Sequence, residues 1–335
     1  MGLGERLMER MNFGIVGTGG IALMMAKACE EVEGVHAYGL YSRTYEKGKE
    51  FANEANIDFV YTDYDEFLSD ENLDFIYLAS PNSLHYPQAK KAIQAHKNVI
   101  VEKPFCSNYQ EAKELVELAE SNDVYLFESM TILHSNNYKL LQEKLSEIGK
   151  IKEVQCTYLQ YSRKYKDLLE GKEPNVFNKK YAGGALMDLG IYNIHFVVGL
   201  FGEPKEVTYY ARNHENGIDL GGTLIMEYED KVVSALAAKD LNGSNRNIIA
   251  GEDGYIIVEG GSNGPKPFSI YTSEKQEHFD VENDKSWFYN ELKDICDIYN
   301  GHDKDKMKSL LNNSLMAMRD IDKAKKSAGI SFEED

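Results

Sequence analysis

Short apolar segments alternate with helical patterns in the first part of the chain. The apolar segments lie at residues 13–16, 35–41, 75–79, 99–101 and 124–127. Apolar side chains recur with helical spacing in the intervening segments, at residues 21–33, 84–96 and 109–121. Strands separated by helices of this length indicate right-handed crossovers and a parallel sheet. Residues 11–130 are therefore predicted to form an α/β domain.

The pattern changes near residue 130. A helix is predicted over residues 135–146 and a long strand over 151–160, and residues 205–258 contain several strand patterns at hairpin-like spacing. Such spacing indicates a mostly antiparallel sheet. Two helical patterns close the chain, at 285–299 and 304–326. We therefore expect a second, α+β domain over residues 131–330, packed on the first with a cleft at the junction.

Length and composition agree with two domains in a cytoplasmic enzyme. With 335 residues, 42% of them hydrophobic, the chain can bury more than one core of usual size. No segment approaches the roughly 18 consecutive apolar residues of a membrane-spanning helix. The first eleven residues lack the apolar stretch of a secretory signal.

Charge and cysteine spacing exclude several classes of function. The formal charge of -18 repels nucleic acid and anionic lipid, so we expect neither as a large partner. A local basic patch for a phosphate is compatible with that charge. The four cysteines show neither a Cys-x-x-Cys motif nor a zinc-ligand spacing, and we predict packed, reduced thiols and no metal site. They are Cys29, Cys106, Cys156 and Cys296.

A glycine-rich turn follows the first strand pattern and opens the first helix. It has the form Gly-x-Gly-x-x-Ala and places a dinucleotide-binding motif in its usual context. Gly17 permits the tight turn, Gly19 lets the backbone approach a pyrophosphate, and Ala22 allows close packing of helix on strand. An ordinary turn is the alternative. The expected cofactor contacts in this turn are Gly17, Thr18, Gly19, Gly20 and Ile21.

The end of the second strand bears on the choice between NADP and NAD. An NAD-selective domain usually has an acidic residue there, which accepts hydrogen bonds from the ribose 2′-hydroxyl. This chain has Ser42 and Arg43 instead. Arg43 can donate charge-assisted hydrogen bonds to a 2′-phosphate, so we predict NADP, with NAD as the second possibility. A solvated surface arginine is the alternative.

Two later strands end in polar loops that are expected to face the nicotinamide. The first loop contains Ser80, Pro81, Asn82 and His85, and it would lie against the ribose and nicotinamide. Helix capping by Asn82 explains the loop about as well as binding does. The second loop contains Glu102, Lys103 and Pro104.

Lys103 is a candidate catalytic residue because of its place at a strand end. Ligands bind beyond the carboxyl ends of the strands in open α/β sheets, so Lys103 is expected to project toward the nicotinamide. Pro104 fixes the turn and biases Lys103 toward an extended backbone. A surface ion pair between Lys103 and Glu102 is the alternative.

Residues 183–198 have the composition of an unusually apolar helix with a narrow polar stripe. Asp188, Tyr192 and His195 follow one another at i, i+4 and i+7 and are expected to share one face. Removing hydride from a carbinol carbon requires a base for the hydroxyl proton. An adjacent ammonium stabilises a phenolate, so Tyr192 beside Lys103 would supply that base. A solvent-facing stripe is the alternative.

Taken together, these motifs resemble the glucose-fructose oxidoreductase, inositol dehydrogenase and rhizopine-catabolism (Gfo/Idh/MocA) family. The resemblance covers about residues 12–330, and no single motif is specific for it. The residues that carry it are the glycine turn, the Ser80-Pro81-Asn82 loop with His85, the Glu102-Lys103-Pro104 motif and the segment 183–192.

The resemblance implies a large open sheet in the second domain, whose outer face makes homodimer or homotetramer contacts. It also implies that Lys103 is the catalytic lysine. Many family members have histidine where this chain has Tyr192. In having tyrosine there, the chain resembles the dihydrodiol dehydrogenase-like branch of the family, which favours NADP and a tyrosine acid-base role. His195 then becomes a contact behind the catalytic pair or with the substrate.

The function we expect is reversible hydride transfer between NADP and a secondary alcohol or carbonyl of a sugar, polyol or cyclic diol. Tyr192 would exchange the proton, Lys103 would hold the phenolate and substrate oxygen, and Asp188 would orient them. Tyr161 and Arg163, after the long strand, are further substrate candidates. Two alternatives are an NAD-dependent glycosidase and a non-catalytic nucleotide-binding regulator, because a fold alone does not define a function.

Overall fold

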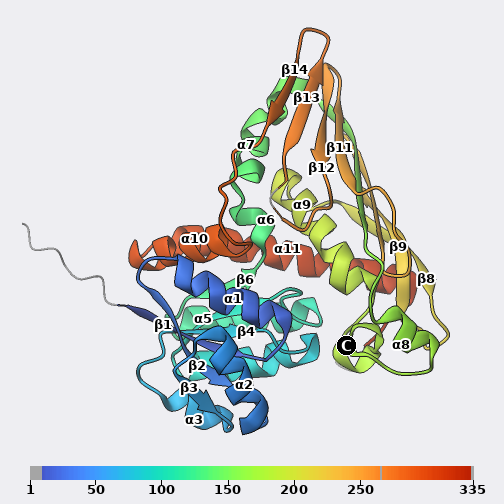
Figure 1. Cartoon of the computed structure of the whole chain (residues 1–335). Coiled ribbons are helices and arrows are strands. Elements are labelled where there is room, and N and C mark those ends of the chain that lie inside the picture. The colour runs from blue at the N-terminus through green and yellow to red at the C-terminus, as the bar shows by residue number, and fades with distance from the viewer. Residues whose placement is uncertain (1–9, 265, 333–335) are drawn as a thin grey trace, which may run out of the picture.

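The computed structural model describes residues 10–264 and 266–332. Within these residues the chain forms two sheets, a six-stranded one from the first part and an eight-stranded one from the second. Figure 1 shows helices on the first sheet, and the second sheet rising above α11 (Lys304–Ala328). Residues 1–9, which contain most of the segment examined for a secretory signal, lie outside the described residues.

The first sheet is parallel throughout, with the strand order β3-β2-β1-β4-β5-β6. This is the order of a doubly wound dinucleotide-binding sheet. Every residue of β4 is buried, as expected for a strand covered on both faces by helices. The strands are β1 (Met11–Val16), β2 (Val35–Tyr41), β3 (Phe59–Tyr61), β4 (Phe75–Leu78), β5 (Asn98–Glu102) and β6 (Leu126–Ser129).

The helices around this sheet confirm the predicted alternation. The helices expected over 21–33, 84–96 and 109–121 are α1, α4 and α5. Helices α2 and α3 and the short strand β3 fill residues 45–69, for which the sequence pattern made no prediction. The strand expected at 124–127 begins at Leu126 and follows a turn in which Asp123 has a left-handed backbone. The helices are α1 (Gly20–Glu31), α2 (Tyr45–Ala55), α3 (Tyr64–Ser69), α4 (His85–Gln94) and α5 (Tyr109–Ser121).

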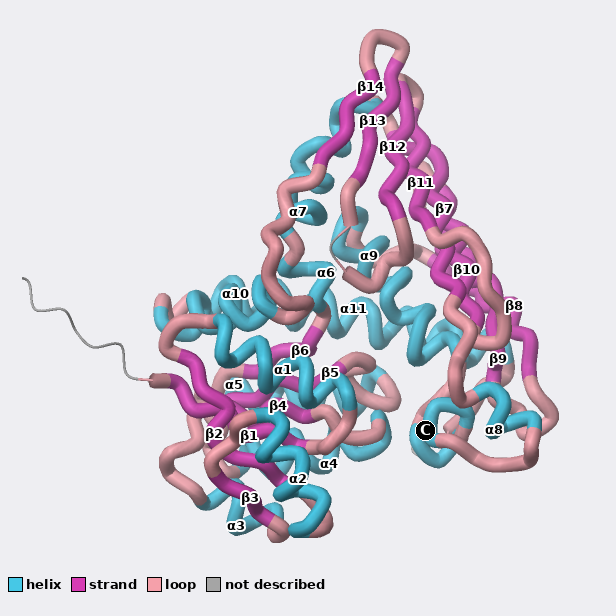
Figure 2. Tube along the Cα trace, viewed as in Figure 1, coloured by secondary structure: helices cyan, strands magenta, loops and turns pink. Residues whose placement is uncertain are grey.

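The second sheet has the order β14-β13-β12-β11-β7-β10-β9-β8 and is mostly antiparallel, as predicted. Within this sheet, β7 and β10 are the one parallel pair among the described strands. Figure 2 shows the strands side by side as one long, twisted sheet. They are β7 (Ile151–Leu159), β8 (Glu206–Asn213), β9 (Asp219–Glu227), β10 (Val232–Ala238), β11 (Arg246–Gly251), β12 (Gly254–Glu259), β13 (Phe268–Thr272) and β14 (Gln276–Phe279).

The apolar segment predicted as a helix covers the inner face of the second sheet. It begins with a π-helical turn, η5 (Leu186–Gly190), and continues as α9 (Ile191–Phe201). Helix α9 packs against β7 and β10, whereas α11 packs against β8. By length and composition, Lys179–Phe201 could cross a membrane, but most of it is buried inside the fold, as in a core helix.

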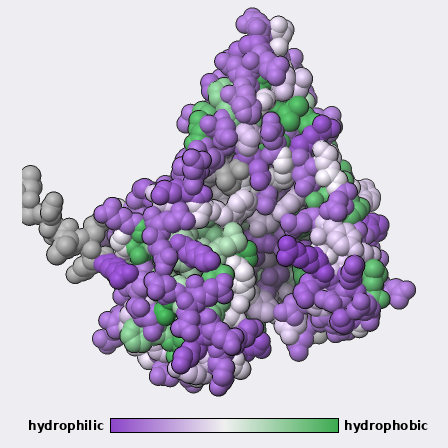
Figure 3. Space-filling view, viewed as in Figure 1, coloured by the Kyte–Doolittle hydropathy of each residue, from purple (hydrophilic) through white to green (hydrophobic). Residues whose placement is uncertain are grey.

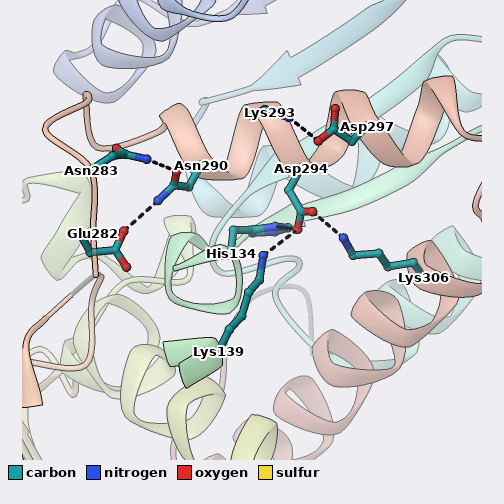
Figure 4. Close-up of polar contacts among 9 residues, drawn as sticks. All are labelled: His134, Lys139, Glu282, Asn283, Asn290, Lys293, Asp294, Asp297 and Lys306. Atoms are coloured by element: carbon teal, nitrogen blue, oxygen red, sulfur yellow. Dashed lines mark hydrogen bonds and ion pairs between the residues drawn. The ribbon is translucent and has the colours of Figure 1, made fainter. Parts of the chain in front are cut away.

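Helix α10 (Tyr289–Asn300) and α11 join the two parts of the molecule. Helix α10 packs against α1 and α6 (Thr131–His134), and α11 packs against α5 and α9. Figure 4 shows the polar contacts that α10 makes with α6, with α11 and with the loop before α10. The buried His134 contacts Asp294 at 2.7 Å, and Asp294 also pairs with Lys306 at 2.5 Å. Burial lowers the His134 pKa, so the ring is neutral near pH 7.

Shorter helices complete the second domain. Helix α7 lies within the predicted segment 135–146, and α8 follows the strand β7. Short 3-10 turns link α8 to the site helix, which is formed by η5 and α9. The elements of this part are α7 (Asn136–Lys144), η2 (Leu145–Ile148), α8 (Tyr165–Leu169), η3 (Asn175–Phe177) and η4 (Lys179–Tyr181). A further 3-10 turn, η1 (Asn82–Leu84), precedes α4 in the first part of the chain.

Candidate active site

The glycine turn between β1 and α1 leaves its backbone open. Gly17 has a φ of +113°, and a Cβ there would lie 2.6 Å from the Ala79 carbonyl oxygen, so only glycine fits. A Cβ at Gly19 or Gly20 would meet nothing within 4 Å. Helix α1 starts at Gly20 without a side-chain cap. Its free N–H groups can therefore receive a pyrophosphate, and the residues fit a dinucleotide.

The structure places Thr18 and Ile21 beside these glycines and Ser42 with Arg43 at the end of β2. Ile21 is 45% exposed in the first turn of α1. Ser42 is buried and donates a hydrogen bond to the Thr44 carbonyl, so it shapes the turn. Arg43 is exposed and makes no ion pair with any residue of 10–264 or 266–332. Its guanidinium is thus available to a phosphate.

His85 ties the two polar loops together and is buried between them. Its Nδ1 lies 2.9 Å from the Pro104 carbonyl oxygen and its Nε2 3.0 Å from that of Ser80. The side chain is completely buried, and burial lowers its pKa. The expectation that His85 contacts the cofactor is therefore corrected: it fixes the loops after β4 and β5 relative to each other.

The rest of the first loop reaches across to the second domain. The Asn82 amide donates to the Ala182 carbonyl oxygen at 2.9 Å, and Pro81 precedes it as the first residue of the turn. The Ser80 hydroxyl donates to Gln88 at 2.6 Å. This loop therefore connects the nucleotide half directly to the segment that leads into the site helix.

Glu102 lies in the interior behind Lys103. Tyr77 donates a short hydrogen bond to its carboxylate, and the Lys103 backbone N–H donates a second one at 3.1 Å. Burial raises the Glu102 pKa. Because the carboxylate is engaged inside the protein, Glu102 supports the Lys103 loop, whose Lys103–Pro104 peptide is cis. A surface pair between Glu102 and Lys103 is not what the structure shows.

Lys103 and Asp188 meet at the junction, from opposite halves of the molecule. Lys103 Nζ donates to Asp188 Oδ1 at 2.7 Å and to the Asp188 carbonyl oxygen at 3.0 Å. Burial opposes the Lys103 charge, but Asp188 and Tyr192 raise its pKa above the ordinary value. Burial acts against ionisation of Asp188 too, yet Lys103 and Lys239 lower the Asp188 pKa overall. Near pH 7, Lys103 is therefore a charged ammonium and Asp188 a charged carboxylate.

Tyr192 lies beside the ion pair of Lys103 and Asp188. Lys103 Nζ lies 4.7 Å from the centroid of its ring, and the Tyr158 ring packs edge-on at 5.7 Å between centroids. Burial raises the Tyr192 pKa, and Lys103 lowers it by less. The ammonium acts in the expected direction, but the phenol remains protonated near pH 7. In this state Tyr192 is a proton donor.

His195 does not reach the group formed by Asp188 and Tyr192. Its side chain is completely buried, with Nδ1 2.7 Å from Asn313 Oδ1 and Nε2 3.2 Å from Glu128 Oε2. The predicted polar stripe is therefore divided, because Asp188 and Tyr192 meet Lys103 whereas His195 contacts the interior. The expectation that His195 contacts substrate is therefore wrong.

Two residues that the sequence did not single out hold the site helix. Asp219 Oδ2 accepts a hydrogen bond from the Leu186 backbone N–H at 2.7 Å and from the Tyr209 hydroxyl at 2.8 Å. A Cβ at Gly184 would lie 2.0 Å from Asp219 Oδ1. Asp219 thus caps the helix, and Gly184 makes room for it. The second residue, Lys239, pairs with Asp188 Oδ2.

Tyr161 and Arg163 lie on the exposed side of the second domain, just after β7. Tyr161 is 39% exposed and packs edge-on against Tyr165, and Arg163 is exposed as well. Figure 3 shows a hollow between the lobe that carries α1 and the lobe that carries α8. No hydrogen bond or ion pair within the described part of the chain links Tyr161 or Arg163 to Lys103, so their substrate role stays a prediction.

The chain belongs to the Gfo/Idh/MocA oxidoreductase family. Residues 11–130 match its NAD-binding Rossmann-fold domain, and residues 139–257 match the GFO/IDH/MocA C-terminal domain. The parallel first sheet, the largely antiparallel second sheet and the open glycine turn agree with that assignment. The protein is therefore an enzyme, an oxidoreductase with an NAD(P)-binding Rossmann domain.

Named relatives extend this result. The chain is 34% identical over 249 residues to the uncharacterized oxidoreductase YgjR of Escherichia coli, covering 74% of this chain and 76% of that protein. It is 29% identical over 325 residues to the scyllo-inositol 2-dehydrogenase (NADP+) IolU of Bacillus subtilis, covering 97% and 99%. It is also 29% identical over 245 residues to a trans-1,2-dihydrobenzene-1,2-diol dehydrogenase of Xenopus tropicalis, covering 72% and 71%.

Solved structures show the same fold. The 3-ketoreductase KijD10 of Actinomadura kijaniata, crystallised with NADP and TDP-benzene, superposes with a TM-score of 0.83. The alignment covers 95% of this chain and 97% of that one at 18% identity.

Proposed function

We propose that this enzyme is an NADP-dependent oxidoreductase that interconverts a secondary alcohol and a carbonyl on a sugar, polyol or cyclic diol. The observation that carries the proposal is the meeting of Lys103, Asp188 and Tyr192, an ammonium, a carboxylate and a phenol, next to an open dinucleotide turn. The relatives named for NADP-dependent inositol oxidation and for dihydrodiol oxidation support the substrate class.

Lys103, Tyr192 and Asp188 have different roles because their protonation states differ. When bound at the glycine turn, the nicotinamide cofactor supplies or accepts the hydride. Lys103 uses two of its three N–H groups on Asp188 and has the third for the substrate oxygen. Tyr192, protonated near pH 7, donates its proton to that oxygen during carbonyl reduction. Asp188 keeps Lys103 charged and in place.

The same protonation state favours reduction over oxidation near neutral pH. An oxidation needs Tyr192 to accept a proton, and its raised pKa leaves little phenolate for that step. A positively charged oxidised nicotinamide nearby would lower the pKa again. We infer that carbonyl reduction with NADPH is the faster direction at pH 7.

A substrate screen tests this function. Purified protein is incubated with NADPH and a panel of ketoses, inososes and cyclic hydroxyketones, and with NADP and the matching alcohols, while the absorbance of the reduced cofactor is followed. Net oxidation of NADPH by at least one carbonyl substrate is the expected result. Hydrolysis of a glycoside without net change in cofactor would instead identify the NAD-dependent glycosidase, and no reaction at all would favour the nucleotide-binding regulator.

We also propose a homodimer or homotetramer built on the outer face of the second sheet. Tyr210, 68% exposed, and Leu236, 37% exposed, both lie opposite Thr223 and so share that face. Large apolar side chains gathered on an open sheet are typical of an interface. Light scattering after gel filtration should give a multiple of the 38.0 kDa chain mass, whereas a monomer would contradict the proposal.

A further inference from the structure

Asp188 has two ammonium partners, one on each carboxylate oxygen. Lys103 Nζ contacts Oδ1 at 2.7 Å and Lys239 Nζ contacts Oδ2. The three side chains differ in exposure: 29% for Asp188, 14% for Lys103 and 4% for Lys239. Lys239 therefore lies on the closed side of the carboxylate, where it meets Asp188 but has almost no surface for a substrate.

The backbone around Lys239 is fixed on both sides. The residue directly follows β10, its N–H donates to the Leu220 carbonyl at 2.8 Å, and its own carbonyl accepts from the Ser162 N–H at 2.7 Å. Its ammonium also lies 6.0 Å from the centroid of the Phe177 ring. A lysine anchored in this way holds its charge at a defined place relative to the sheet.

We propose that Lys239 is a positioning residue for the hydride-transfer reaction, which acts by holding Asp188. The inference rests on the proposed function above. By occupying Oδ2, Lys239 restricts Lys103 to Oδ1 and to the Asp188 carbonyl oxygen, and the third N–H of Lys103 stays directed at the substrate oxygen. Without Lys239, the free Oδ2 competes with the substrate for that N–H.

The charge of Lys239 has a second effect on the same aspartate. Asp188 is taken out of water, which disfavours its ionised form, and two ammonium groups offset that cost. Removing one of them raises the Asp188 pKa. A protonated Asp188 no longer fixes the Lys103 ammonium, so activity is then lost at a higher pH on acidification.

The kinetic test uses Lys239→Met with Lys231→Met as the matched control. Lys231 directly precedes β10, is 14% exposed and pairs with Asp230, so the control removes the same charge from the other end of one strand. We expect Lys239→Met to lower kcat for carbonyl reduction about tenfold or more, with the dissociation constant for NADPH unchanged. Lys239→Arg recovers most of the rate, and Lys231→Met changes neither quantity.

A double-mutant cycle separates action through Asp188 from any independent effect. In an Asp188→Asn background, adding Lys239→Met should change kcat less than about twofold, since Lys239 then has no carboxylate to hold. An equal loss in both backgrounds overturns the proposal.

The same cycle, measured on the thermal midpoint, needs no substrate. Lys239→Met lowers the midpoint of the wild-type protein but raises it in the Asp188→Asn background, where two neighbouring ammonium groups lack their counter-ion. Failure of the wild-type protein to turn over any substrate refutes the proposed function and leaves this sign reversal measurable. Absence of the reversal refutes the role of Lys239 whether or not turnover is found.

Discussion

The ammonium nitrogen of Lys103 lies 4.7 Å from the centroid of the Tyr192 ring. Lys103 comes from the end of β5 in the nucleotide half, and Tyr192 comes from α9 on the second sheet. The two groups can act on one substrate only because the halves are fixed against each other. Asp188, four residues before Tyr192, links the halves through its ion pair with Lys103. Chemistry at this site therefore depends on the domain junction.

Tyr192→Phe removes the proposed proton donor and little else. We expect carbonyl reduction to slow about a hundredfold or more, while NADPH binds as before because the ring and its packing on Tyr158 remain. Steady-state rates and NADPH fluorescence titration measure the two quantities. Tyr86→Phe, which removes a phenol hydroxyl that bonds to Glu114 on the surface of the first domain, serves as the control. Unchanged turnover in Tyr192→Phe would assign the proton to another group.

The pH dependence of reduction follows from the raised Tyr192 pKa. A phenol whose pKa lies above its ordinary value keeps its proton throughout the neutral range. We therefore expect the reduction rate at saturating NADPH to vary less than about twofold between pH 7 and 9. The oxidation rate should rise over that range as the phenolate fraction grows. A reduction rate that falls with a midpoint below about pH 8 would show that the donor is a different, more acidic group.

Cofactor choice depends on Arg43. Arg43→Gln should raise KM for NADPH about tenfold or more, because a charge-assisted contact with the 2′-phosphate is lost, and should leave KM for NADH unchanged. Lys27→Gln removes an exposed positive charge from α1 and should alter neither constant. Equal effects of Arg43→Gln on both cofactors, or a wild-type preference for NADH, would contradict the assignment of NADP.

Asp320 should reduce stability above neutral pH. Burial raises its pKa to about 6, above the unfolded value of about 3.9. The folded state thus binds this proton more tightly than the unfolded state. The stability that protonated Asp320 contributes is complete below about pH 4 and is lost as the pH rises through about 6. Asp320→Asn should raise the free energy of unfolding by about 1–3 kcal/mol at pH 8 and much less at pH 4. Lys323 keeps its second partner, Glu203, in this variant.

Denaturant unfolding at the two pH values measures that difference, and Asp284→Asn, at an exposed loop position, is the control. A gain of equal size at pH 4 and pH 8 would mean that titration of Asp320 is not its source.

The alternation of strands and helices could be predicted from sequence because each element has its own periodicity. The parallel sheet followed from β1, β2, β4, β5 and the helices between them. The short strand β3 was missed, since Phe59–Tyr61 is too brief to show a period and its three residues are only partly covered. Its place is set by pairing with β2, which is a contact and not a local pattern.

The part of the candidate site that lies in local sequence motifs could be predicted. Lys103, Asp188 and Tyr192 lie together as expected, because a strand end and a helix face each leave a sequence pattern. His195 was misplaced because periodicity cannot tell a polar group in the interior from one in a cleft. Lys239 could have been found from the sequence, because it is a charged residue directly after the apolar strand 232–238. The same pattern, a lysine at a strand end, pointed to Lys103.

The crowding at the start of the site helix sets which parts of the enzyme tolerate redesign. A Cβ at Gly183 would lie 2.7 Å from the Val176 carbonyl oxygen, and Gly184 is equally confined by Asp219. Substitutions there would displace Asp188 and Tyr192 together. Exposed residues around α8, such as Leu169, lie outside this crowded region and tolerate changes in size far better.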